Sequence, residues 1–351
     1  MSETVSTEIA QSGCKDNENI FSCKHVSIIL VIYLGRDGCI FVSMFAIFVD
    51  IKIKSKMKAF EKSSSQSKIM YLFIFSLVGL FLASSLVTVI SGFVGAEVLQ
   101  SPWGLRISSA IQMVLMFFMP ALTLIIWSNY KPSVFLELNR RNSDIVKLTF
   151  FSIAILVLAM PFISLVAKLN QMLILPEWMS GLEVWMEELE QSAEEATELL
   201  LSGKSIVDYL SNLIFIAVIA SIAEEVFFRG VLQQLLIKHF KNEHVGVWLT
   251  AIVFSLMHLQ FYGFLPRVML GAMLGYLFVF TRNLWIPILI HFLNNALVVT
   301  FNFFLRDNPL YQALEDPSFN TPFVLLGILS LFFTVFTFFL LEPDPMYPPE
   351  D

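Results

Sequence analysis

The chain contains few cysteines and few charged residues. It has three cysteines in 351 residues, Cys14, Cys23 and Cys39. This distribution excludes a disulfide framework and thiol catalysis from the rest of the chain. Charged residues make up 15% of the sequence, whereas soluble domains average about 25%. The low charge argues against an ordinary soluble domain.

Short signatures of several enzyme classes are also missing. The sequence has no Gly-x-Ser-x-Gly pattern of serine hydrolases and no His-Glu-x-x-His pattern of zinc proteases. It has no glycine-rich phosphate loop, no nucleic-acid motif and no long-period repeat. The net charge of -7 comes mainly from one acidic loop, so it does not indicate nucleic acid as a partner.

Apolar residues dominate instead. Hydrophobic residues make up 56% of the chain, phenylalanine alone occurs 35 times, and the mean hydropathy is +0.73. The apolar residues form repeated runs of about 20, the length that a helix needs to cross a bilayer. The runs lack the alternating pattern of a membrane β-barrel. We therefore predict an all-α, multi-pass membrane protein.

Eight apolar stretches are predicted to span the membrane. Basic residues precede the first stretch and lie in the loops after the second, fourth and sixth, for example Lys131, Lys238 and Arg282. Because basic loops face the cytoplasm, we expect both chain ends inside, in a bacterial cytoplasmic membrane. The approximate limits of the stretches are 69–95, 107–127, 146–168, 206–237, 246–262, 265–281, 285–305 and 322–341.

The loop 169–205 falls on the outer side in this topology. It is rich in glutamate, and Trp185, Leu189 and Leu200 recur at helical spacing. This pattern predicts an amphipathic helix at the membrane interface. Two interpretations stay open, a solvated cap over the bundle and a lid that handles substrate.

The two ends of the chain differ from the membrane domain at 57–341. Residues 1–56 combine a polar leader with a hydrophobic segment, 26–49, which Gly35-Arg36-Asp37-Gly38 interrupts. The segment is an additional span, an uncleaved signal-like segment or a stretch not translated in the cell. We hypothesise that the working protein begins near Met57. The Pro-rich tail 342–351 is predicted to be extended.

A pair of carboxylates lies within the fourth stretch, in Ala223-Glu224-Glu225-Val226-Phe227-Phe228-Arg229. An ionisable group at membrane depth costs about 2.5–3.5 kcal/mol on insertion scales, so it indicates pairing, a wet cavity or chemistry. Glu225 and Arg229 are four residues apart and can pair on one helix face. Glu224 points about 100° away from Glu225. We therefore expect Glu224 to be the free carboxylate and the candidate base.

Two histidines lie in apolar runs, His258 in the fifth stretch and His291 in the seventh. Phe254 shares a helix face with His258, and Asn295 shares one with His291. Asn294 points elsewhere and is interpreted as a helix–helix contact. A lone histidine in such a run is a hydrogen-bonded core residue about as often as it is a functional residue. Two histidines together with the glutamate pair favour a site.

The set of a carboxylate, two imidazoles and an amide can activate a water, move a proton and stabilise an oxyanion. Attack by water is the simplest chemistry for it. No cofactor is expected, although Glu224, His258 and His291 form a set of ligand types that zinc also takes.

These motifs, Glu224-Glu225-x-x-x-Arg229, Phe254-x-x-x-His258 and His291-x-x-x-Asn295, resemble those of the CPBP family of CAAX prenyl proteases and bacteriocin-processing proteins, also called the ABI family. The resemblance covers residues 205–300. It implies an eight-helix intramembrane endopeptidase whose cavity opens toward the cytoplasm and which needs no metal.

By the same resemblance, Glu224 activates the water, His258 holds or activates it, and His291 with Asn295 forms the oxyanion hole. Glu225, Arg229 and Phe254 are supporting residues. The implied partner is a membrane-associated protein or peptide substrate. Two other functions stay open. One is a non-catalytic membrane immunity or scaffold protein, and the other is a proton-coupled transporter.

Overall fold

The computed structural model of the protein describes residues 60–138, 144–173, 175–309 and 317–341. The chain divides into two units, Met1–Ile53 and Lys54–Asp351, and every described residue belongs to the second unit. The predictions for residues 1–56, for a start near Met57 and for the tail 342–351 lie outside the described residues.

All regular secondary structure in the described ranges is helical. Seven helices are long and apolar enough to cross a membrane, and an eighth apolar helix, α12 (Glu243–Leu256), is shorter. These findings confirm the prediction of an all-α polytopic membrane protein. The seven long helices are α2 (Ser65–Val94), α4–η1–α5 (Pro102–Trp127), α7 (Ile145–Gln171), α9–η3–α10–η4–α11 (Ile206–Phe240), α13 (Phe264–Thr281), α14 (Trp285–Leu305) and α16 (Thr321–Phe339).

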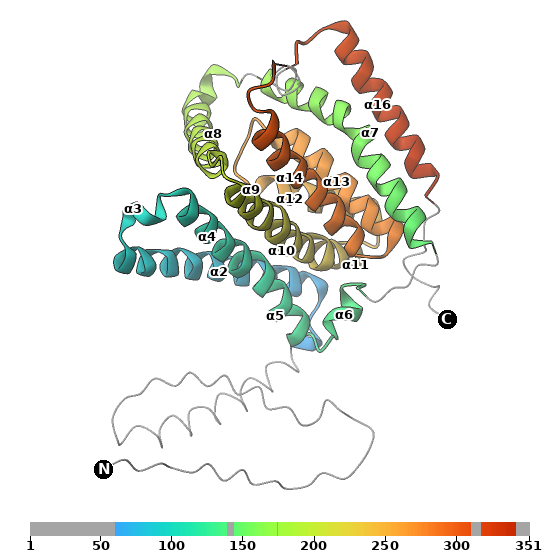
Figure 1. Cartoon of the computed structure of the whole chain (residues 1–351). Coiled ribbons are helices and arrows are strands. Elements are labelled where there is room, and N and C mark those ends of the chain that lie inside the picture. The colour runs from blue at the N-terminus through green and yellow to red at the C-terminus, as the bar shows by residue number, and fades with distance from the viewer. Residues whose placement is uncertain (1–59, 139–143, 174, 310–316, 342–351) are drawn as a thin grey trace, which may run out of the picture. The chain divides into compact units, whose positions relative to one another are not determined.

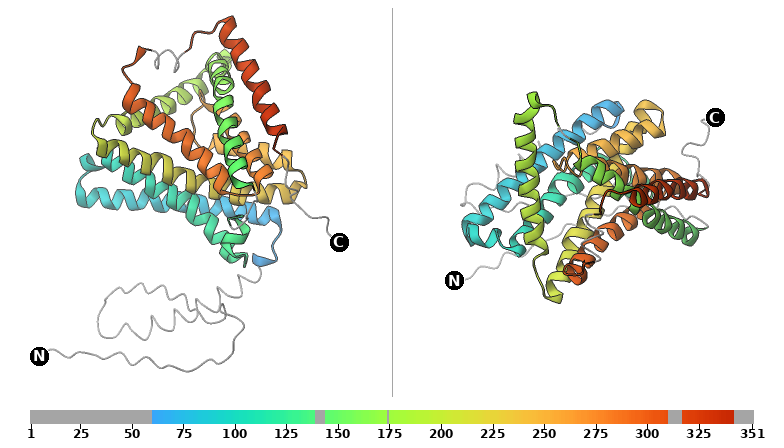
Figure 2. Two further views of the ribbon diagram at one scale, coloured as in Figure 1. Left: turned by 45° about the vertical axis from the view of Figure 1, so that its right-hand side comes forward. Right: turned by 90° about the horizontal axis from the view of Figure 1, so that it is seen from above.

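Three further short elements and one longer helix connect these spans. The short ones are α3 (Ala96–Leu99), α6 (Pro132–Phe135) and η2 (Glu177–Met179). The longer one, α8 (Ser180–Leu201), is the amphipathic helix expected within 169–205, and none of its residues is buried. Seen from above, α8 crosses the ends of other helices instead of running beside them (Figure 2).

The predicted limits of the fifth span were wrong. The apolar run 246–262 is not one helix, because α12 ends at Leu256 and α13 begins at Phe264. Leu259 adopts a positive φ of 54°, which ends the helical path. Hydropathy does not register this turn, since Met257 and Leu259 are as apolar as the helix before them. His258 therefore lies in a turn and not inside a span.

Several helices begin at polar capping residues, as local chemistry requires. The side chains of Ser64, Asn242 and Asn320 accept hydrogen bonds from backbone N–H groups in the first turns of α2, α12 and α16. Ser205 and Asp208 form a reciprocal capping box at the start of α9 (Ile206–Asn212).

The helix that carries the glutamate pair is irregular on both sides of it. A π-helical segment, η3 (Leu213–Ile219), precedes α10 (Ala220–Phe227), and a second, η4 (Phe228–Gln233), separates α10 from α11 (Gln234–Phe240). Such wide turns shift the register of the side chains that follow and are frequent at functional sites.

The spans pack around the α10–η4–α11 segment. One apolar core joins this segment to α2, η1 and α5, and contains Phe117, Phe227 and Phe228. A second core joins α7, α13 and α14, with α16 packed against α7 (Figure 1). The tightest pair is the α12–α13 hairpin. Large apolar side chains on α2 and α16 remain exposed, as expected for faces that contact lipid.

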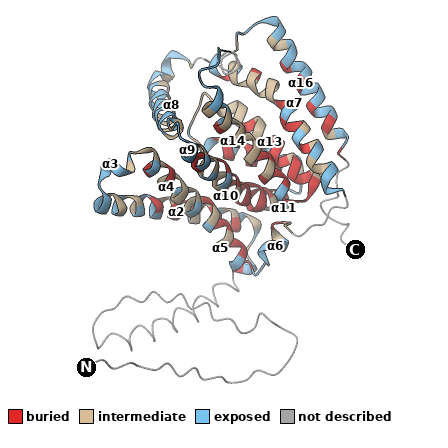
Figure 3. Ribbon diagram, viewed as in Figure 1, coloured by how far each residue is buried: buried red, intermediate tan, exposed pale blue. Residues whose placement is uncertain are grey.

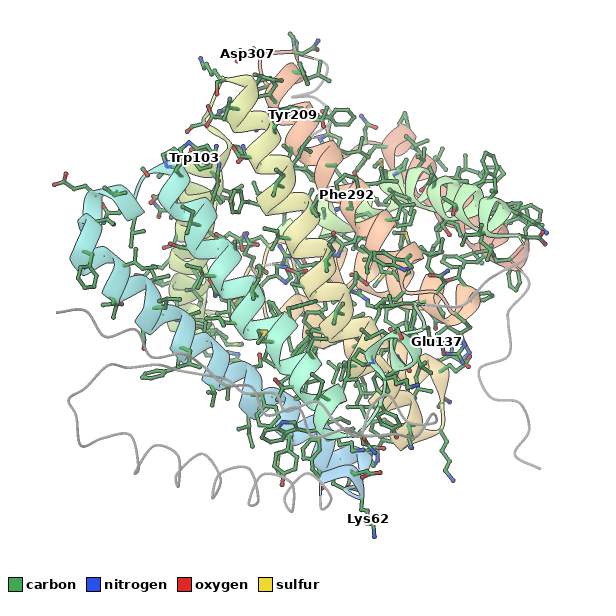
Figure 4. The ribbon with its side chains drawn as sticks, turned by 60° about the horizontal axis from the view of Figure 1, so that its bottom comes forward. Lys62, Trp103, Glu137, Tyr209, Phe292 and Asp307 are labelled. Carbon is green, nitrogen blue, oxygen red and sulfur yellow. The ribbon has the colours of Figure 1, made fainter. Side chains whose placement is uncertain are left out.

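The membrane unit has two ends of different character. We call one the basic end, formed by the start of α2, by α6 and by the end of α11. The other is the acidic end, formed by α8, the start of α9 and the turn 257–263. Figure 4 labels Lys62 and Glu137 at the basic end, and Trp103, Tyr209 and Asp307 at the acidic end.

Candidate active site

The glutamate pair is buried inside the bundle. Glu224 is 4% exposed, and Glu225 and Arg229 are completely buried. The Arg229 guanidinium donates to Glu225 Oε1 at 2.6 Å and to the carbonyl of Gly271 on α13 at 2.9 Å. The predicted pairing four residues apart is present, and it also ties α10 and η4 to α13.

His291 on α14 joins this ion pair from the opposite side. Its Nδ1 lies 2.7 Å from Glu225 Oε1. Because an ionised carboxylate can only accept, Nδ1–H is the donor. The other nitrogen, Nε2, lies 3.9 Å from Glu224 Oε2. Glu225 therefore orients the imidazole and directs its free nitrogen toward Glu224.

His258 is fixed in a similar way. Its Nδ1 donates to the Phe254 carbonyl at 2.8 Å, so its Nε2 is also left for another partner. The Phe254 ring lies 5.0 Å from the His258 ring and 6.0 Å from the His291 ring. The predicted contact of Phe254 with His258 is thus present, although α12 ends between the two residues, at Leu256. Phe254 acts as the spacer between the two imidazoles.

Phe254 also shields the buried cation. The Arg229 guanidinium lies over its ring at 4.8 Å, a cation–π distance. Phe228 packs edge-on against the same ring at 5.1 Å. The rotamer of Phe254 is therefore fixed from several directions, and this fixes the spacing of the polar groups.

Asn295 lies one turn beyond His291 on α14. Its Nδ2 donates to the carbonyl of Ile216, in the π-helical segment η3, at 3.2 Å. One of its two N–H groups is therefore engaged with the neighbouring helix. Asn294, interpreted above as a helix–helix contact, donates to Asn295 Oδ1 at 3.2 Å, so it supports Asn295 within the same helix.

The structure thus brings the predicted residues together. Glu224 lies 3.9 Å from His291 Nε2, and the Phe254 ring contacts the rings of both His258 and His291. Glu225 and Arg229 hold this group from behind. Phe292, the residue after His291, lies between the two ends of the unit in Figure 4. Glu224, Glu225 and His291 are buried inside the bundle, whereas His258 lies in the turn 257–263 at the acidic end.

Zinc is the metal that the set Glu224, His258 and His291 could hold by ligand type. Among the described residues, no three His, Cys, Asp or Glu side chains are grouped closely enough to hold a metal ion. Metal independence stays a prediction.

Two residues near the site were not predicted from the sequence. Arg267 lies in the first turn of α13, and its guanidinium donates to the backbone carbonyl and the side-chain oxygen of Gln260 in the turn that carries His258. The signal was present, because an ionisable residue in a predicted span is a functional candidate.

The other missed residue is Asn170 at the end of α7. Its amide donates to the Phe261 carbonyl and accepts from the Leu265 N–H, both at 2.8 Å. These bonds hold the turn that carries His258. Nothing in the sequence connects position 170 with 261, since the contact depends on how the helices pack.

Comparison with known proteins supports the family suggested by the motifs. Residues 206–297 match the family model described as type II CAAX prenyl endopeptidase Rce1-like. The chain is 27% identical to the membrane-embedded CAAX protease MroQ of Staphylococcus aureus over 136 residues, which cover 37% of this chain and 53% of the relative. No solved structure matches the chain significantly.

A second relative is the uncharacterised protein YpbD of Bacillus subtilis. It is 29% identical over 91 residues, which cover 25% of this chain and 43% of the relative. The chain therefore spans about half the length of the curated relatives that it matches. The family model spans the three motif helices, and every site residue named above except Asn170 lies within 206–297.

Proposed function

Residues 206–297 place this chain in the CPBP family of CAAX proteases, and from this premise we propose that it is an intramembrane endopeptidase that works without a metal. Its substrate is a membrane-associated protein or peptide, and the nucleophile is a water activated by Glu224. The observation that carries the proposal is the buried carboxylate of Glu224, 3.9 Å from the free Nε2 of His291.

The first step requires a base and a bound water. Glu224 is the base, because the other carboxylate, Glu225, already accepts from Arg229 and His291. The Nε2 atoms of His258 and His291 are potential partners of that water, because each imidazole already uses its Nδ1 in another contact. Glu224 takes a proton from the water as the water oxygen attacks the scissile carbonyl carbon.

The second step is collapse of the tetrahedral intermediate. In this proposal His291 carries a proton on both nitrogens throughout the cycle, so its Nε2–H and the second N–H of Asn295 donate to the negative oxygen. Glu225 stabilises the positive charge on His291, as a carboxylate does behind a catalytic imidazole. The proton held by Glu224 then passes to the leaving amine, and the peptide bond breaks.

The test compares Glu224→Gln with the wild-type protein in cells. We expect the variant to insert normally and to lose cleavage by at least about 10²-fold, the usual contribution of a general base. The measurement is quantitative mapping of new peptide ends in the membrane proteome. Glu97→Gln, at an exposed position on α3, is the matched control and should leave the pattern unchanged.

Other results would favour the two alternative functions. Identical peptide ends for Glu224→Gln and wild type would favour the scaffold or immunity protein, which needs the ion pair but no base. Proton-dependent solute flux in liposomes would favour the transporter. Once a cleaved protein is identified, purified components treated with a strong chelator should retain activity, and recovery that requires added zinc would refute metal independence.

A further inference from the structure

Helix α13 carries none of the proposed catalytic residues, yet it packs against the helix of the glutamate pair. Residues 223–233 of that helix are all buried. Figure 3 shows buried residues gathered around α10, α11 and α13, whereas α8 is coloured mainly as exposed. The contact between α13 and the α10–η4 segment therefore lies in the interior of the bundle, next to the site.

Two glycines of α13 make this contact close. Gly271 and Gly275 are both buried and lie one helical turn apart. Small residues at this spacing let the backbones of two membrane helices approach each other, because no side chain stands between them. The carbonyl groups of these glycines are therefore within reach of side chains from the neighbouring helix.

Two side chains of η4 donate to these carbonyl groups. The Arg229 guanidinium donates to the Gly271 carbonyl at 2.9 Å, and the Gln233 amide donates to the Gly275 carbonyl at 3.0 Å. The donors are four residues apart in η4, and the acceptors are four residues apart in α13. The result is a pair of parallel hydrogen bonds between the two helices, one turn apart.

The amide of Gln233 contributes little to stability. Gln233 is completely buried, and its Oε1 has no hydrogen-bond partner among the described residues. A buried acceptor without a partner costs more free energy than one intramolecular hydrogen bond gains. The Gly275 carbonyl lies within α13 and keeps its helical bond whether or not the amide is present. An apolar side chain of the same size would therefore serve stability at least as well.

The pair of bonds leads directly to the site. Arg229 also donates to Glu225 Oε1, and the same oxygen accepts from His291 Nδ1. The imidazole held in this way presents its Nε2 to Glu224 at 3.9 Å. The position of η4 against α13 therefore sets the orientation of His291 through two consecutive contacts.

Helix α13 also contacts the aromatic spacer of the site. A methyl group added at Gly271 would lie 3.3 Å from Phe254 Cδ1 and 3.2 Å from Ala251. The Phe254 ring in turn contacts the rings of His258 and His291. Both the ion pair and the spacer are thus placed against the same face of α13.

Two bonds one turn apart fix what one bond does not. A single hydrogen bond is a pivot about which two helices can rotate, whereas a second bond further along the axis prevents the rotation. Helices in lipid gain no hydrophobic free energy by associating, so polar contacts matter for their register. The bond of Gln233 therefore completes the alignment that the bond of Arg229 begins.

We propose that Gln233 is a positioning residue of the reaction. Its bond to Gly275 fixes the register of η4 on α13 and, through Arg229 and Glu225, the orientation of His291. This inference rests on the proposed function, because the chemistry that it positions is that of the intramembrane endopeptidase. It assigns a role in activity, and not in stability, to an amide outside the three motifs.

Gln233→Met tests this role, because methionine is of similar length and flexible but cannot donate to the Gly275 carbonyl. We expect the variant to insert normally and to keep or exceed the wild-type melting temperature in detergent, since the unpaired Oε1 is removed. Cleavage should fall by between about tenfold and about 10²-fold, as for a misplacement of about 1 Å at the reacting groups. The measurements are the melting temperature and quantitative mapping of peptide ends in the membrane proteome.

Gln234→Met is the matched control. Gln234 follows Gln233 directly, but its amide donates to the Phe135 and Gly230 carbonyls and not to α13. We expect this variant to cleave at the wild-type rate. An equal loss of cleavage in Gln233→Met and Gln234→Met would overturn the inference, because the effect would not depend on the bond to α13.

A second variant approaches the same contact from α13. In Gly275→Ala the added methyl would lie 2.8 Å from Gln233 Oε1 and 2.9 Å from Val247 Cγ1, so it displaces the amide. We expect cleavage to fall to a similar extent at an unchanged melting temperature. This variant decides the question if Gln233→Met melts early or does not fold, and any other result with it would then overturn the inference.

Wild-type cleavage by Gln233→Met would overturn the inference outright. Glu224→Gln separates this failure from a failure of the proposed function. If Glu224→Gln leaves the peptide ends unchanged, the proposed function is wrong and the role of Gln233 falls with it. If Glu224→Gln abolishes cleavage and Gln233→Met does not, only the role of Gln233 is refuted.

Discussion

At the scale of single residues, the main feature is that two adjacent carboxylates have unequal surroundings. Glu225 accepts from a guanidinium and an imidazole through one oxygen, and its other oxygen, Oε2, is buried without a hydrogen-bond partner among the described residues. Glu224 has His291 Nε2 at 3.9 Å and is free to bind a small molecule. The two residues therefore divide structure and chemistry between them.

This division predicts that replacement of Glu225 by glutamine and replacement of Glu224 by glutamine have different effects on stability. Glu225→Gln leaves the Arg229 charge completely buried without its counter-ion, and breaking a buried pair in this way costs about 3–5 kcal/mol. We expect a clear fall in thermal stability in detergent, measured by size-exclusion after heating. Glu224→Gln should unfold close to the wild-type temperature. Equal losses of stability in the two variants would contradict the division.

Much of this site was predictable from spacing alone. The pairing of Glu225 with Arg229 follows from their separation by one helical turn, and the burial of Glu224 follows from its apolar neighbours. The link from His291 to Glu225 was not predictable, because it joins helices 66 residues apart. The hydrogen bond from Asn295 to the Ile216 carbonyl was not predictable either, since it depends on a π-helical turn that no sequence pattern predicts.

At the scale of elements, the turn 257–263 is the piece whose position decides the site. It is held by Asn170 from α7, by Glu190 from α8 and by Ser255, whose hydroxyl donates to the Phe264 carbonyl at 2.8 Å. The turn has backbone bonds of its own, such as Leu259 N–H to the Leu256 carbonyl at 3.1 Å, but its remaining polar groups need other partners at membrane depth. These hydrogen bonds therefore position His258 indirectly, through the turn that carries it.

Asn170→Ala should loosen this turn without unfolding the bundle. The change removes partners from the Phe261 carbonyl and the Leu265 N–H, and each lost partner costs about 1–3 kcal/mol. We expect faster hydrogen exchange in peptides covering 257–265, unchanged exchange in α2, and cleavage reduced by at least about tenfold, one decade per 1.4 kcal/mol.

The control is Gln191→Ala, which removes an amide from an exposed position on α8 and should change neither measurement. If Asn170→Ala exchanged hydrogen in 257–265 at the wild-type rate, the turn would not depend on the hydrogen bonds of Asn170. The sequence predicted the helices on either side of the turn but not the turn itself. Hydropathy is continuous from Val253 to Leu259, and only the backbone geometry at Leu259 reveals where the helix stops.

At the scale of the whole molecule, helix α2 packs against the part of the bundle that carries the glutamate pair. The helix α2 packs against η1, α5 and α11, and Ser76 on α2 donates to the Met116 carbonyl at 2.8 Å. Leu72 on α2 is completely buried in the core that contains Phe227 and Phe228. Residues from α2 onward therefore stabilise the helix of the glutamate pair.

The hypothesis that the working protein begins near Met57 predicts that a chain beginning there inserts, unfolds at the same temperature and cleaves at the same rate as the full chain. The matched control begins at Ala96 and so lacks α2, which leaves Leu72's neighbours in the core without cover and the Met116 carbonyl without its donor. We expect this shorter chain to lose stability and activity. The measurement is the melting temperature of each purified protein together with its yield in the membrane. Loss of insertion or activity in the Met57 chain would show that residues 1–56 contribute to the working protein.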